Sequence, residues 1–167
     1  MAKTKSGSRK FAAVYGAELQ EFFAEAQMKY ASDELRPYGD HPDEYIVEYV
    51  REPWTYIDRW CGGEPYMGMT TIYGEGVPCF GMVYFGRIMP YAKSQEEVLK
   101  CLMEALQKVN PNCPWRGPRR FTACNGLRYR NSWTGSVRKF EGTEEIWGAS
   151  KEILYSATYR GGIINKD

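Results

Sequence analysis

Apolar residues recur along the chain with two different spacings, and each spacing predicts a different element. Residues 11–30 and 94–109 repeat them every three or four positions, which predicts two amphipathic helices. In the second helix, Ser94 and Glu97 fit a capping box. The blocks 45–89 and 121–164 are rich in aromatic and β-branched residues punctuated by Gly, which favours antiparallel strands. Pro53 is expected to break the first strand or to place it at an edge.

The two strand-rich blocks are similar to each other. With two one-residue gaps, residues 56–89 and 129–164 share nine identities, among them Trp60 with Trp133 and Tyr84 with Tyr159. A helix precedes each block. We therefore predict an α+β fold of two α-β-β-β units, residues 11–89 and 94–164, with both helices on one face of a combined antiparallel sheet. We expect residues 1–167 to form a single domain in which residues 1–10 are a flexible arm.

Strand alternation then predicts which side chains share a face of the sheet. Asp58 and Asn131 occupy matched positions between aromatic residues, so an aromatic face with a few polar groups is expected from Tyr56, Asp58, Trp60, Tyr84, Tyr129, Asn131, Trp133 and Tyr159. Such a surface is typical of a small-molecule pocket at the junction of the repeats, with Arg119 or Arg120 as a cation at its rim. The alternative is that these rings are ordinary core, with Asp58 and Asn131 bonded to backbone or Tyr hydroxyls.

Composition narrows the function classes. The 167 residues are 43% hydrophobic and 26% charged, which is ordinary for a globular domain. No apolar run is long enough for a membrane span and no signal-peptide pattern follows the basic N-terminus, so we expect a cytoplasmic protein without a membrane partner. One His and five Cys without a CxxC pair predict reduced thiols, no metal and no cofactor. The phosphate-loop and nucleophile-elbow motifs are absent.

Charge is segregated along the chain although the net charge is only +1. Residues 18–52 hold ten acids against three bases, whereas residues 110–140 hold no acid and seven bases: Arg116, Arg119, Arg120, Arg128, Arg130, Arg138 and Lys139. The two blocks could face each other within the fold. Alternatively, the basic block could bind nucleic acid, or the acidic block could mimic it on a basic partner. Direct nucleic-acid binding is not favoured, because the net charge is near zero and no recognition motif is present.

Several short stretches resemble a bacterial domain family of unknown function: EFFAEAQMKYAS, IYG…VYFGRIM, PWRGPRRF, LRYRNSW and IWG…LYSATYRGGII. That family occurs alone and as the C-terminal part of helix-turn-helix regulators. The resemblance implies a regulatory or effector-binding role and no catalytic residues. Operator binding is not expected, because the DNA-binding helices are lacking here.

The leading hypothesis is a non-enzymatic ligand-binding or regulatory domain that takes a small molecule or a short protein segment. One alternative is a phage- or defence-linked inhibitor acting on nucleic-acid machinery. The other is a small enzyme that uses Asp58 as a general acid or base. An antiparallel sheet with an exposed edge could also pair across a two-fold axis to form a homodimer.

Overall fold

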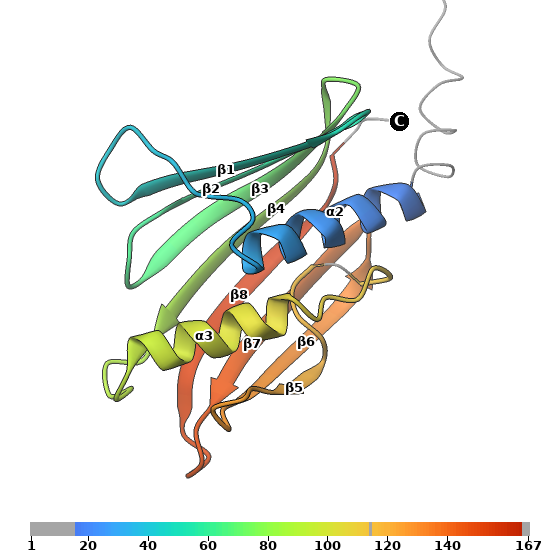
Figure 1. The fold of residues 1–167 in the computed structure, drawn as a ribbon. Coiled ribbons are helices and arrows are strands. Elements are labelled where there is room, and N and C mark those ends of the chain that lie inside the picture. The colour runs from blue at the N-terminus through green and yellow to red at the C-terminus, as the bar shows by residue number, and fades with distance from the viewer. Residues whose placement is uncertain (1–15, 114, 165–167) are drawn as a thin grey trace, which may run out of the picture.

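The computed structural model describes residues 16–113 and 115–164 (Figure 1). The predicted arm, residues 1–10, and the predicted beginning of the first helix lie outside these residues. The elements follow one another as α2 (Gly16–Ala31), β1 (Glu44–Arg51), β2 (Trp54–Cys61), β3 (Tyr66–Gly74), β4 (Val77–Ile88), α3 (Gln95–Leu106), β5 (Arg120–Thr122), β6 (Arg128–Ser136), β7 (Lys139–Trp147) and β8 (Ile153–Ile163). The expected α+β class is confirmed.

A single antiparallel sheet of eight strands, in the order β1-β2-β3-β4-β8-β7-β6-β5, forms the framework. Each half of the chain supplies a meander, and the two meanders join where β4 pairs with β8. Four strands therefore follow each helix, one more than the predicted three, because β1 and the short β5 precede the strands matched in sequence. Pro53 lies in the turn between β1 and β2, as its missing N–H donor predicts.

Both helices lie on the same face of the sheet (Figure 1). Helix α2 contacts β1 and β2, and α3 contacts β5, β6 and β7. Ser94 caps α3 by accepting a hydrogen bond from the Glu97 amide, and the predicted stripe from Val98 to Leu106 is buried. In α2 the equivalent anchors are Phe22 and Phe23, which have almost no exposed surface.

The core joins the two halves of the sheet. Phe80 of β4 stacks on Phe140 of β7 with ring centroids 5.8 Å apart, and Phe140 stacks on Trp115 at 4.2 Å. These rings belong to the cluster that also contains Phe22 and Phe23 of α2. A second cluster lies under α3, where Ile146 and Tyr155 are buried. Neither half has a complete core of its own.

Strand registers agree with the sequence match between the two halves. Gly68 of β3 pairs with Trp60 and Tyr84, and Gly142 of β7 pairs with Trp133 and Tyr159. A Cβ atom on either glycine would lie 2.4 Å from the ring of its paired tyrosine, so each ring crosses its neighbouring strand where a side chain is missing. Tyr84 and Tyr159 are themselves paired across the β4–β8 junction. The registers support a duplication, which stays a prediction.

Candidate functional site

A cavity of about 660 Å³ lies between the two helices and the sheet. One wall is the end of α2 with the loop that follows it, and the opposite wall is the side of α3 that carries Leu99, Leu102 and Met103. Strands β2, β3 and β4 contribute Asp58, Trp60, Tyr66 and Tyr84, and Arg116 enters from the connector after α3. The cavity therefore has largely apolar walls, with Asp58 and Arg116 at the sheet side and Asp33 in the loop after α2.

Asp58 is a buried carboxylate whose hydrogen-bond partners are hydroxyls. Thr70, directly opposite on β3, donates to Oδ1 at 2.9 Å, and Tyr84 donates to both carboxylate oxygens at 3.1 Å. Burial raises the pKa of Asp58, and the Thr70 and Tyr84 hydrogen bonds, together with the charge of Arg116, only partly oppose that rise. No ion pair in residues 16–113 and 115–164 includes this carboxylate.

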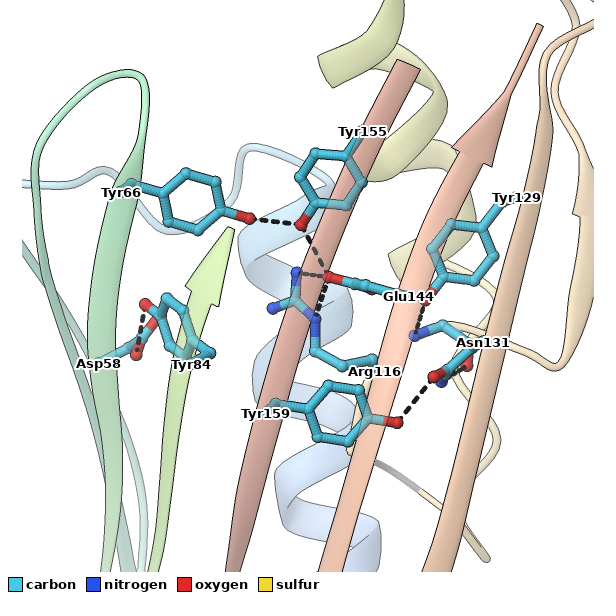
Figure 2. Close-up of polar contacts among 10 residues, drawn as sticks. Asp58, Tyr66, Tyr84, Arg116, Tyr129, Asn131, Glu144, Tyr155 and Tyr159 are labelled. Atoms are coloured by element: carbon cyan, nitrogen blue, oxygen red, sulfur yellow. Dashed lines mark hydrogen bonds and ion pairs between the residues drawn. The ribbon is translucent and has the colours of Figure 1, made fainter. Parts of the chain in front are cut away.

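Glu144 of β7 is the second buried acid, and it has a cationic partner (Figure 2). Its Oε1 atom accepts hydrogen bonds from Arg116 Nε at 2.8 Å and from the Tyr155 hydroxyl at 2.9 Å, and Arg116 Nη2 lies 2.6 Å from the same oxygen. The Tyr129 hydroxyl donates to Oε2 at 2.6 Å. Burial alone would lower the pKa of Arg116, but Glu144 raises it well above its ordinary value, so the guanidinium stays charged.

Other tyrosine side chains lie between the surroundings of Asp58 and those of Glu144. The Tyr66 and Tyr155 hydroxyls are 2.5 Å apart, so Tyr66 extends the Glu144 network to the cavity wall (Figure 2). Arg116 also lies over the ring of Tyr84 at 5.7 Å. Burial raises the pKa of both Tyr30 and Tyr66 to about 12, so these hydroxyls remain neutral hydrogen-bond donors at physiological pH.

Asn131 repeats the hydrogen bond made by Asp58 but serves a structural role. The Tyr159 hydroxyl donates to Asn131 Oδ1 at 2.7 Å, as that of Tyr84 does to Asp58. Asn131 Nδ2 then donates to the carbonyl of Gly117 at 2.8 Å, and the Gly117 amide donates to the Tyr129 hydroxyl at 3.1 Å. These hydrogen bonds hold Gly117 in the connector after α3, and thereby position the neighbouring Arg116 at the cavity.

The residues predicted to form one pocket are divided among several places. Asp58, Trp60 and Tyr84 line the cavity. Tyr56 is buried in the core against Phe23, with ring centroids 6.1 Å apart. Tyr129, Asn131 and Tyr159 are buried in the network behind Arg116 and do not appear among the lining residues.

The predicted rim residues lie elsewhere. Arg119 stacks over Trp133, with the guanidinium carbon 3.9 Å from the ring centroid, and both line a separate hollow that also includes Val83 and Phe85. Arg120 lines a third hollow beside β6. The cation in the cavity is Arg116, which the sequence had placed among the candidate nucleic-acid contacts and which is instead buried against Glu144.

The acidic and basic blocks of the sequence do not form ion pairs with each other in the described parts of the chain. Glu25 pairs with Arg51 and Lys29 with Glu34, all within the acidic block, and the buried Arg116 pairs with Glu144 outside it. The interpretation that the two blocks face each other therefore gains no support from an ion pair. The acids of the first block are exposed except for Glu25, which is partly buried.

Residues 16–113 and 115–164 contain neither a cluster of metal-ligating side chains nor a helix that could span a membrane. No group of three or more His, Cys, Asp or Glu side chains there is arranged to hold a metal ion. All five cysteines are free. No helix in the same ranges has the length and apolar content needed to cross a bilayer.

Residues 58–164 match a domain family of unknown function, DUF5680. The chain belongs to this family. No curated protein and no solved structure matches it. In this DUF5680 domain the family segment runs from within β2 to the end of β8, so it contains Asp58, Tyr84, Arg116 and Glu144, whereas the α2 wall of the cavity precedes it.

Proposed function

We propose that this DUF5680 domain binds a small organic molecule in the cavity between its helices and its sheet. The observation that carries the proposal is Asp58, a buried carboxylate that lines the cavity and has hydroxyl partners but no cation in ion-pair contact among the described residues. Burial of an acid without a countercharge costs free energy, and such sites are more common where a ligand is bound than in ordinary core.

The dimensions and chemistry of the cavity support the same function. Small-molecule sites usually enclose about 300–1,000 Å³ and combine apolar walls with a few polar groups. Here Leu99, Leu102 and Met103 of α3 face a sheet surface that holds Asp58 and the Tyr66 hydroxyl. A ligand in this position would contact α2, α3 and the sheet together. Such contacts would give a regulatory role a physical basis, because binding would favour one spacing of the helices.

The other two hypotheses rest on weaker observations. An inhibitor that mimics nucleic acid is favoured by the exposed acids of residues 18–52, but solvated charges are the normal state of a protein surface. An enzyme is favoured by the raised pKa of Asp58 in a cavity. However, the hydroxyls of Thr70 and Tyr84 both donate to Asp58, and burial raises the pKa of Tyr84 well above its ordinary value, so neither hydroxyl is suited to relay a proton between Asp58 and a substrate.

Blocking the cavity tests the proposal. Leu99 is 42% exposed and lines the cavity, so Leu99→Trp should fill it without disturbing the core. Val83→Trp is the matched control, because Val83 is 48% exposed and lines the hollow containing Arg119 and Trp133. The probes are benzyltrimethylammonium, neopentylbenzene and phenylmethanesulfonate. At least one probe should raise the melting temperature of the wild type and of Val83→Trp but not of Leu99→Trp, and equal shifts in all three proteins would refute the site.

A further inference from the structure

We infer that the ligand of this cavity is an organic cation, with an ammonium group held against Asp58 and an apolar body against α3. This inference rests on the proposed function and adds the chemical class of the ligand. Two independent features of the cavity point to it: the arrangement of aromatic rings around Asp58, and the balance of buried charges.

Aromatic rings surround the Asp58 end of the cavity. Trp60, two residues along β2 from Asp58, stacks on Tyr45 with centroids 5.3 Å apart, and the Trp60 and Tyr30 rings form a T-shaped pair with centroids 5.7 Å apart. Tyr66 and Tyr84 meet edge to face at 6.1 Å. All five of these rings line the cavity. Ring faces attract cations, and groups of such rings beside a carboxylate are how proteins recognise ammonium ligands.

One of these rings already has a cation over it. The Arg116 guanidinium lies over the Tyr84 ring, 5.7 Å from its centroid. The faces of Tyr30, Tyr45 and Trp60 have no comparable cation contact among the described residues, whose cation–ring pairs involve other rings. The environment is therefore suited to positive charge, and a ligand in the cavity would meet these rings where they are not stacked on each other.

The balance of charge in and behind the cavity is negative. Asp58 and Asp33 line it, and Arg116 is the one basic residue among its described lining residues. The positive charge of Arg116 is compensated by Glu144, which is completely buried and contacts it through two nitrogens. Asp58 thus has no ion-pair partner among the described residues, and the charge of Arg116 acts on it only from a longer distance. An anion would meet that carboxylate unfavourably, whereas an ammonium group would supply its missing partner.

Isosteric probes and one matched variant test the inference. Benzyltrimethylammonium and neopentylbenzene have the same shape and differ in one positive charge. Asp58→Asn removes the carboxylate charge and should fold, because Asn131 at the matched position accepts the same hydrogen bond from Tyr159. Glu141→Gln, an exposed acid on the opposite face of the sheet, is the control.

In titrations of the full chain followed by tryptophan fluorescence, we expect the cation to bind at least tenfold more tightly than neopentylbenzene. Asp58→Asn should weaken cation binding at least tenfold and leave neopentylbenzene unchanged, and Glu141→Gln should alter neither. If neopentylbenzene or phenylmethanesulfonate binds as tightly as the cation, and Leu99→Trp abolishes that binding, the cation inference is overturned while the proposed function stands. If none of the three probes binds, both are overturned.

Discussion

Each half of the sheet has a matched pair of facing residues that includes one buried acid, but the acid lies on a different strand of the pair in each half. Asp58 of β2 lies opposite Thr70, whereas Asn131 of β6 lies opposite Glu144. Each pair thus holds one carboxylate, but only that of Glu144 forms an ion pair, with Arg116. Strand alternation in the sequence placed Asp58 and Asn131 on the covered face. Glu144 was missed although the same alternation puts it inward beside Ile146, and an acid at an inward position was the available signal.

Replacement of Asp58 by Asn should reveal the cost of burying this charge. Because burial raises the pKa of Asp58, the folded protein holds the proton more tightly than the unfolded chain. The Asp58 carboxyl group therefore reduces the unfolding free energy of the wild type as the pH rises from its unfolded pKa of about 3.9 to its higher folded pKa. The reduction persists above the folded pKa. The Asp58→Asn variant has no carboxyl group at this position, so its unfolding free energy does not show this reduction.

Urea denaturation between pH 3 and pH 7 measures the difference. The unfolding free energy of Asp58→Asn relative to wild type should increase with pH above the unfolded pKa of Asp58 and level off above its raised folded pKa. A relative stability that decreases with pH would show that the folded state favours the charged carboxylate, contrary to this description.

Glu144→Gln should be strongly destabilising. The substitution leaves the buried Arg116 without its countercharge, and loss of one partner of a buried pair typically costs about 3–5 kcal/mol. Adding Arg116→Met should recover part of that loss, because no unpaired charge then remains. The free energies of unfolding of the single and double variants measure this coupling. Additive losses would mean that the two side chains do not stabilise each other.

Among the elements, those with a strong local pattern were predictable. The cap at Ser94 and the apolar stripe of α3 were correct, as were the two blocks of strands and the inward faces of β2 and β6. Strands β1 and β5 were not separated from their neighbours. Pro53 marked a break in the first strand, but the prediction did not count the segment before it as a strand of its own, and β5 has only three residues, too few to show alternation.

Glycines opposite the paired tyrosines should resist substitution. In Gly68→Ala and Gly142→Ala the new methyl group would lie 2.4 Å from the ring of Tyr84 or Tyr159 and 2.7 Å from a backbone oxygen, so the ring must move. We expect each variant to lose about 1–3 kcal/mol of stability, as overpacked sites do. Gly63→Ala has no neighbouring atom within 4 Å and should change little. Thermal denaturation provides the comparison, and wild-type stability of both ring-facing variants would contradict the close approach.

At the scale of the whole molecule, the two halves share one sheet and one core. The β4–β8 pairing and the Phe80–Phe140 stack cross between them. The sequence predicted that the halves pack together, but it could not place the cavity. Arg116 enters from a connector rich in Pro and Gly, whose path no periodicity specifies, and the position of α3 relative to β3 depends on packing between layers.

Shared packing predicts a single unfolding transition. Since Trp115 packs on Phe140 in the core that also includes α2, neither meander should melt separately. Tryptophan fluorescence and far-ultraviolet circular dichroism should give the same midpoint in urea. Two separated transitions would show that the halves are independent units.

A crystal structure of the full chain with benzyltrimethylammonium tests the central claim most directly. We expect the ammonium group beside Asp58, within about 6 Å of the centroid of at least one ring among Tyr30, Tyr45 and Trp60. Occupancy of only the hollow lined by Val83 and Phe85, with the cavity at Asp58 unchanged, would contradict it.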